Sequence, residues 1–332
     1  MSRQSSKPLV TLADVRDAEA RIAPHVVTTP LIDAPLLDRE IGFRLLVKAE
    51  NLQLTGAFKV RGAFNHIMQL SEDERRRGVV AVSSGNHAQA VAYAAQSQGV
   101  PATIVMPRDA PRVKLERTRR YGATIVLYDR ETDDRDAVAD GLAARDGLRI
   151  VHPYDDPRTI AGQGTIGLEI FRQTRERSVE PHAIVAGCSG GGLASGLALT
   201  LGLYDRRPRL FTAEPENFDD MRRSLALGAH VVNEQRSGSI CDALLAPTPG
   251  RNTLPILLEC GAEGLAASDA EVESAVRVAA AHFNMILEPG GAAALACALA
   301  RRGEFSGRTV VVVASGGNID TAAYADLLAR AG

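Results

Sequence analysis

Lysine is scarce in this chain, so the few lysines are the first candidates for amine chemistry. Of the 38 basic residues only four are lysines, Lys7, Lys48, Lys59 and Lys114. Arginine cannot form a Schiff base, because its guanidinium stays protonated. Lys7 lies in the polar N-terminal tail, Lys114 lies on a charged helix face, and Lys48 is expected to pair with Glu50. The scarcity narrows the choice of a Schiff-base lysine to four residues, although a base-composition bias explains it equally well.

Lys59 has the sequence context that best fits a reactive amine. It stands in Thr55-Gly-Ala-Phe-Lys-Val-Arg-Gly62, with glycines on both sides, an aromatic neighbour and a helix expected to follow. Desolvation in such a setting lowers the pKa of a lysine and frees the neutral amine as nucleophile and base. The alternative is a solvated lysine at a helix start, which this segment alone does not exclude.

The loop Gly187-Cys-Ser-Gly-Gly-Gly-Leu193 has the composition of an anion site. It follows an apolar run and precedes a helix expected over Leu193–Leu203. Bare backbone N–H groups and the partial positive charge of a helix N-terminus suit a phosphate monoester. The loop lacks the lysine of a P-loop, and Ser195 stands where a dinucleotide fingerprint has its last glycine, so nucleotide binding is disfavoured. A tight turn is the alternative, but three successive glycines exceed what a turn requires.

Three further loops carry Gly, Ser and Asn and are uninformative when taken singly. Ser83-Ser-Gly-Asn-His87 and Ser315-Gly-Gly-Asn318 each follow an expected strand, and Glu288-Pro-Gly-Gly291 separates two expected helices. Each could be an ordinary helix cap or turn. In open α/β sheets, however, ligands bind at the carboxyl ends of the strands, where two of these loops would lie.

Composition excludes several classes of protein. The chain has 332 residues, 45% hydrophobic and 23% charged, with a net charge of −2. It therefore has residues for a large core, while the lack of a basic excess argues against nucleic acid as the main partner. No apolar run reaches the roughly 18 residues of a membrane span, and no signal peptide is apparent. The cysteines are widely spaced and form no C-x-x-C pair, which predicts reduced thiols in a cytoplasmic protein: Cys188, Cys241, Cys260 and Cys297.

Continuous apolar runs alternate with alanine- and arginine-rich helical segments along the chain. Such runs are typical of strands buried on both faces, and their alternation with helices predicts an α/β fold with parallel sheets. Helix starts are indicated at Thr11, Ser71 and Ser268, the last with a full capping box, and a final helix is expected over Thr321–Ala331. Eight strands, enough for two sheets, are expected at Leu45–Lys48, Val79–Val82, Thr103–Met106, Thr124–Tyr128, Arg149–His152, Ala183–Ala186, Leu210–Ala213 and Thr309–Val313.

Taken together, the segments resemble the pyridoxal-phosphate enzymes of the tryptophan-synthase-β fold (fold type II), and within them the threonine/serine dehydratase and serine racemase group. The resemblance covers nearly the whole chain, and several motifs in fixed order carry it. They are Thr-Pro-Leu at 29–31, Lys48-Ala-Glu-Asn51, Gly56-Ala-Phe-Lys-Val-Arg-Gly-Ala63, Ser83-Ser-Gly-Asn-His87, His152-Pro-Tyr-Asp155, Ala161-Gly-Gln-Gly-Thr165, Ser189-Gly-Gly-Gly192, Glu288-Pro-Gly-Gly291 and Ser315-Gly-Gly-Asn318.

The resemblance implies two doubly wound parallel-sheet domains with pyridoxal 5'-phosphate in the cleft between them. Residues 1–78 and 157–332 would form the large domain, and residues 79–156 a smaller, mobile one that closes over substrate. The group also implies a homodimer. Tyr154 stands where some relatives carry Asn, and Ala243 stands where many carry Gly.

The same resemblance implies roles for individual residues. Lys59 would form the Schiff base and move the α-proton, and Ser84 would act on the opposite ring face. A divalent cation, Mg²⁺ or Ca²⁺, would be held by Glu214, Asp220 and the carbonyl of Phe218. The cofactor residues would be Phe58, Lys59, Asn86, Ser189, Gly190, Gly191, Gly192, Leu193 and Ser315; those for the substrate carboxylate would be Ser83, Ser84, Asn86 and His87.

The activity so implied is a threonine/serine ammonia-lyase, which eliminates a β-hydroxyl to give a 2-oxo acid and ammonia. Within the group the alternatives are a serine racemase and a dehydratase for 3-hydroxyaspartate or a hydroxyectoine-derived amino acid. For 3-hydroxyaspartate an arginine must reach the second carboxylate, and the sequence has too many arginines to choose one. A β-replacing synthase fits the Ser83–His87 loop less well. From another class, the alternative is a non-catalytic homologue that binds a phosphate ligand.

Overall fold

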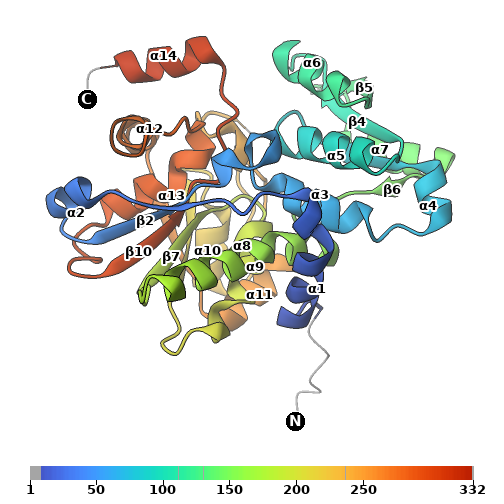
Figure 1. Ribbon diagram of the computed structural model, residues 1–332. Helices are drawn as coiled ribbons and strands as arrows, with labels where there is room; N and C mark the ends of the chain where they lie inside the picture. Colours follow the sequence, from blue (N-terminus) through green and yellow to red (C-terminus); the bar gives the residue numbers. More distant parts are fainter. Residues whose placement is uncertain (1–8, 111, 130, 236, 331–332) are drawn as a thin grey trace.

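Two separate sheets organise the chain (Figure 1). The computed structural model describes residues 9–330 except 111, 130 and 236; the predictions at Lys7 and Ala331 therefore lie outside the described residues. The larger sheet has the order β1-β2-β10-β7-β8-β9, and the smaller has β5-β4-β3-β6. Both are parallel except where edge strand β1 pairs antiparallel with β2. The predicted fold class, two parallel-sheet α/β domains of fold type II, is confirmed.

The eight strands expected from apolar runs are all present, with ends within two residues of those predicted. Two strands were missed. Strand β1 has only three residues. Strand β9, Glu-Gly-Leu-Ala-Ala, lacks the β-branched and aromatic residues that mark a strand. The bounds are β1 Leu31–Asp33, β2 Arg44–Lys48, β3 Val79–Val82, β4 Ala102–Pro107, β5 Thr124–Tyr128, β6 Arg149–Ile150, β7 Ala183–Gly187, β8 Arg209–Pro215, β9 Glu263–Ala267 and β10 Thr309–Val313.

The helices begin where polar caps indicated. Thr11, Ser71 and Ser268 each form a capping box. The helix predicted over Leu193–Leu203 is shorter, because α9 ends at Ala198 and a single 3₁₀ turn follows at Leu201–Leu203. The bounds are α1 Leu12–Ile22, α2 Pro35–Ile41, α3 Lys59–Ile67, α4 Glu72–Arg77, α5 Asn86–Ser97, α6 Arg112–Arg120, α7 Arg135–Asp146, α8 Pro157–Glu176, α9 Gly192–Ala198, α10 Asp220–Leu227, α11 Thr253–Cys260, α12 Asp269–Phe283, α13 Pro289–Ala300 and α14 Thr321–Ala329.

Helices cover each sheet and pack against it through apolar layers. An apolar layer that includes α12 and α13 packs on one face of the larger sheet, and a layer that includes α8 and α9 packs on the other. A third layer joins the smaller sheet to α3 and α5. The loops after β3, β7 and β10 lie at the carboxyl ends of these strands, where the sequence predicted them.

The four strands of the smaller sheet come from one stretch of the chain, from β3 to β6. They lie together with α5, α6 and α7, the helices between them, in Figure 1. The predicted domain boundaries, and the mobility of the 79–156 segment, stay predictions. Among the described residues, no helix is both long enough and apolar enough to cross a membrane.

Candidate active site

A cavity of about 480 Å³ lies where the loops of the two sheets meet. Its volume is within the ordinary range for small-molecule sites. The loops that were uninformative singly all contribute to its lining. So does every residue expected to bind cofactor or substrate: Phe58, Lys59, Ser83, Ser84, Asn86, His87, Ser189, Gly190, Gly191, Gly192, Leu193 and Ser315.

Lys59, the first residue of α3, lines the cavity with its amine in the desolvated setting that the sequence suggested. Its Nζ donates to the carbonyl oxygen of Pro153 at 2.8 Å. The same nitrogen lies 5.1 Å from the centre of the Phe58 ring. Burial lowers the pKa of Lys59 to about 8. A sizeable share of the amine is therefore neutral near physiological pH, which is the form that attacks an aldehyde.

The glycine loop after β7 needs glycine both for its backbone conformation and for its contact with Tyr154. Gly191 has φ of +98°. A Cβ on Gly190 would lie 2.1 Å from the ring of Tyr154, so that ring rests directly on the loop. No side chain caps the start of α9, so its first backbone N–H groups remain for an anion. These features fit a phosphate group.

The Ser83–His87 loop is organised by its own hydrogen bonds. The backbone N–H of Gly85 donates to Oγ of Ser83 at 3.1 Å. Nε2 of His87 lies 2.8 Å from the carbonyl oxygen of Val151 and must carry the proton there. Burial, aided by the charge of Lys59, lowers the pKa of His87 to about 3. The imidazole is therefore neutral and committed to Val151, which leaves the backbone of His87 for a substrate carboxylate.

Two cations that the sequence did not mark as site residues also line the cavity, Lys114 and Arg135. Lys114, on α6, donates to Asp242 at 2.8 Å and so ties the smaller-sheet body to the loop before α11. Arg135 is the first residue of α7, and its Nε is 3.8 Å from Asp136. Nothing in the sequence distinguishes Arg135 from the chain's other arginines. Only the fold brings it to the cavity.

The three residues expected to bind a metal lie close together at the end of β8. Glu214 is fully buried, and its two oxygens accept the backbone N–H groups of Met221 and Arg222. Asp220 accepts from Asn233 through Oδ1, while its buried Oδ2 has no hydrogen-bond partner. Burial raises the pKa of both carboxyl groups, that of Asp220 to about 7. Among the described residues, no group of three or more His, Cys, Asp or Glu is arranged to hold a metal ion.

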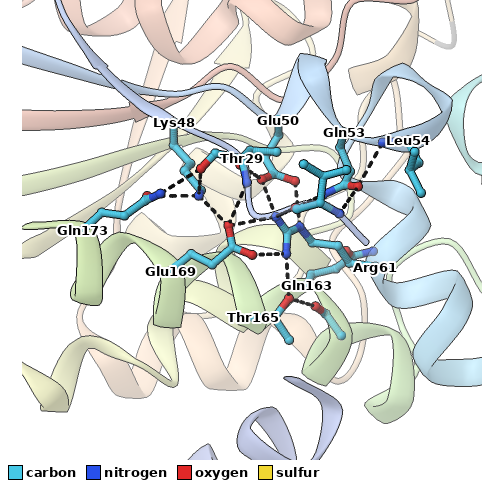
Figure 2. A network of polar contacts seen from close by, with 12 residues as sticks. Thr29, Lys48, Glu50, Gln53, Leu54, Arg61, Gln163, Thr165, Glu169 and Gln173 are labelled. Atoms are coloured by element: carbon cyan, nitrogen blue, oxygen red, sulfur yellow. Dashed lines mark hydrogen bonds and ion pairs between the residues drawn. The ribbon is translucent and has the colours of Figure 1, made fainter. Parts of the chain in front are cut away.

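A buried ionic cluster surrounds Arg61, two residues after Lys59 in the sequence (Figure 2). Arg61, on α3, contacts Glu50 and Glu169, each at 2.7 Å. The expectation that Lys48 pairs with Glu50 is wrong, because its Nζ lies 2.5 Å from Glu169 instead. Glu50 is taken by Arg61 and by the Thr29 hydroxyl. Sequence proximity misled here, because Glu169 reaches Lys48 from helix α8.

Comparison with known proteins places this site in a family. Residues 22–316 match the family described as pyridoxal-phosphate dependent enzymes. An L-threo-3-hydroxyaspartate ammonia-lyase from Pseudomonas sp is 40% identical over 315 residues, which cover 95% of this chain and 97% of that protein. Among solved structures, a threonine deaminase from T.th. is 41% identical with a TM-score of 0.87, over 93% of this chain and 99% of that one. A maize serine racemase is 35% identical with a TM-score of 0.89, over 96% of each chain.

The chain therefore belongs to the pyridoxal-phosphate-dependent enzymes of fold type II, as its motifs suggested. Within that family it is a lyase of the ammonia-lyase type. The alternative of a non-catalytic phosphate-binding homologue loses its support.

Proposed function

We propose that this enzyme is a pyridoxal-phosphate-dependent ammonia-lyase whose substrate is 3-hydroxyaspartate. The reaction removes the β-hydroxyl as water and the amino group as ammonia, and water taken up at the imine step gives oxaloacetate. The observation that carries the choice of substrate is the presence of Arg135 and Lys114 in the lining of the cavity. The Pseudomonas relative acts on the same compound.

The second carboxylate of the substrate needs a cation, and Arg135 is the best placed. Its approach to Asp136, at 3.8 Å, is a loose pair between exposed side chains, and such pairs contribute little. An incoming carboxylate can therefore take over the guanidinium with two parallel hydrogen bonds. Lys114 is already bonded to Asp242, so it supplies longer-range positive charge.

The positions of the side chains in the cavity lining support the remaining proposed roles. Pyridoxal phosphate, when bound, supplies an electron-withdrawing ring conjugated to the substrate amino group. The neutral amine of Lys59 takes the α-proton, and the backbone of the Ser83–His87 loop holds the α-carboxylate. Ser315, which also lines the cavity, would hydrogen-bond the ring nitrogen of the bound cofactor without forcing it to stay protonated.

The test compares two substrates in two arginine variants. Wild type should turn over L-threo-3-hydroxyaspartate with a higher kcat/KM than L-threonine. Arg135→Ala should lower kcat/KM for 3-hydroxyaspartate by about 100-fold, the size of a lost charged hydrogen bond, and leave that for L-threonine nearly unchanged. Arg112→Ala is the control, because that arginine is exposed and paired with Glu116. A wild type that prefers L-threonine or L-serine would favour the threonine/serine ammonia-lyase instead.

A second activity, racemisation, is favoured by the position of Ser84 in the cavity lining. A base on the face opposite Lys59 would return the α-proton with inverted configuration. Ser84→Ala should then abolish conversion of L-serine to D-serine while leaving ammonia release measurable. Ser97→Ala, at an exposed position at the end of α5, serves as the control.

A divalent cation, Mg²⁺ or Ca²⁺, is a further part of the proposal. The buried, unpartnered Oδ2 of Asp220 beside buried Glu214 supports it, with the Phe218 carbonyl as third ligand. Adding either ion should raise the melting temperature of the wild type and leave that of Asp220→Asn unchanged. No shift in the wild type would remove the metal from the proposal.

Homodimeric assembly and a cytoplasmic location complete the proposal. The described cysteines are all free thiols, which fits a reducing compartment. The dimer rests on the resemblance alone, and light scattering after size exclusion tests it.

A further inference from the structure

Two side-chain amides and one carboxyl group, hydrogen-bonded in a line, join three loops of the active site. Nδ2 of Asn318 donates to Oδ1 of Asn86 at 2.8 Å. Nδ2 of Asn86 donates in turn to Oε1 of Glu288 at 2.5 Å. Asn318 belongs to the loop after β10, Asn86 begins α5 beside the smaller sheet, and Glu288 precedes α13. The line therefore crosses from the larger sheet to the smaller one and back.

The backbone fixes the direction of this line. Nδ2 of Asn318 also donates to the carbonyl oxygen of Thr55 at 2.7 Å. A carbonyl can only accept, so the nitrogen of Asn318 must lie on that side. Both of its N–H bonds are then used, and the atom of Asn86 that faces it must be the oxygen. Asn86 is thus obliged to present its nitrogen on the other side.

Glycines make room for the contacts. A Cβ on Gly56 would lie 2.6 Å from Oδ1 of Asn318, and a Cβ on Gly316 would lie 2.2 Å from Oε1 of Glu288. Thr55 itself has φ of +62°, a conformation that costs free energy for a residue with a side chain. The backbone N–H of Gly317 donates to the carbonyl of Gly56 at 2.9 Å. The segment that leads into Lys59 is therefore held against the Asn318 loop.

We infer that Asn318 and Glu288 are positioning residues, which lock the amide of Asn86 so that its N–H faces the ring hydroxyl of the cofactor. The nitrogen of Asn86 carries two N–H bonds, and Glu288 uses one of them. The other has no protein acceptor among the described residues and is available to an oxygen in the cavity. Burial raises the pKa of Glu288 to about 7, and either oxygen of the carboxyl group can accept from Asn86. This inference rests on the role that the family resemblance implies for Asn86, which is contact with the cofactor's ring hydroxyl.

The decisive experiment compares two ligands that differ only at that hydroxyl. Calorimetric titration of the cofactor-free full chain would use pyridoxal phosphate and its 3-deoxy analogue, which keeps the aldehyde and the phosphate. Asn318→Asp removes both donors at nearly constant shape. It should weaken pyridoxal phosphate by about tenfold, the size of one hydrogen bond, and change affinity for the analogue by less than about twofold. Asn318→Leu provides a second variant should the aspartate disturb folding.

Two controls separate positioning from a general structural role. In an Asn86→Ala background, Asn318→Asp should cause no further loss, because the group on which it acts is gone. Glu288→Gln keeps an acceptor and should bind both ligands as the wild type does, whereas Glu288→Leu should behave like Asn318→Asp.

Each failure has a distinct meaning. An equal loss for both ligands in the Asn318 variants would overturn the positioning role. The positioning role would also be overturned if Asn86→Ala weakened only pyridoxal phosphate while the Asn318 variants bound both ligands as the wild type does. If Asn86→Ala weakens the binding of both ligands equally, then Asn86 does not contact the ring hydroxyl, and the inference falls with it.

Discussion

Two lysines, eleven positions apart in the sequence, lie in opposite electrostatic surroundings. Lys48 is fully buried, and Lys59 is half-buried in the lining of the cavity. Lys48 lies in the ionic cluster, where burial lowers its pKa but the charges of Glu169 and Glu50 oppose that effect. Lys59 lies in the active-site cavity, where burial again lowers the pKa and no carboxylate opposes it. The cluster stabilises a charged amine for structure, and the cavity leaves an amine free for chemistry.

The cluster is nearly balanced in charge and almost fully enclosed. Burial disfavours the charge of Arg61, but Glu50 and Glu169 outweigh it and raise its pKa. A buried group of this kind adds little net stability, yet removing one member strands another charge. Because Arg61 lies two residues after Lys59, the cluster also fixes the helix that carries the proposed Schiff-base lysine.

Substitution of the two lysines should separate the tasks most strongly. Lys59→Ala should lower kcat by roughly 10⁴-fold or more, as loss of a nucleophile does, with the protein still folded. Lys48→Met should lower the free energy of unfolding and leave activity measurable. Steady-state ammonia release and urea denaturation of both variants provide the check. A Lys59→Ala protein with near wild-type turnover would contradict the assignment.

Removing a carboxylate from the cluster should have the next largest effect. Glu169→Gln leaves Arg61 and Lys48 with one buried partner between them. It should cost about 3–5 kcal/mol in the free energy of unfolding. Glu19→Gln breaks the exposed pair with Arg172 and should cost no more than about 1 kcal/mol. Equal effects in the two urea titrations would show that the cluster is unimportant.

The pH dependence of cofactor uptake should give the smallest but most specific effect. A lowered pKa means that Lys59 loses its proton at lower pH, so the neutral amine predominates above about pH 8. The rate of pyridoxal phosphate uptake by the cofactor-free chain should rise about tenfold per pH unit from 6 and level off near 8. An ordinary lysine would keep rising towards roughly pH 10. Stopped-flow absorbance distinguishes the two curves.

The sequence predicted what depends on local pattern. Continuous apolar runs gave eight strands, and polar caps such as Ser268 gave helix starts, because burial on both faces and capping leave a local signature. It missed β9, whose Gly and Ala residues leave no such signature. For Lys48 it predicted the nearby Glu50 as partner, whereas in the fold Lys48 pairs with Glu169 of α8.

In the candidate site, too, some features were predictable from the sequence and others depended on the fold. The types of its residues determined the chemistry: a lysine between glycines, a run of three glycines, and the Ser83–His87 loop are recognisable in the chain. Their order matched a family, and the fold brought all of them to one cavity. Tertiary structure alone decided which arginine reaches that cavity, which way the Asn86 amide faces, and which lysine lacks a carboxylate partner. These depend on distances between segments far apart in the chain, and charge–charge energies change steeply over such distances.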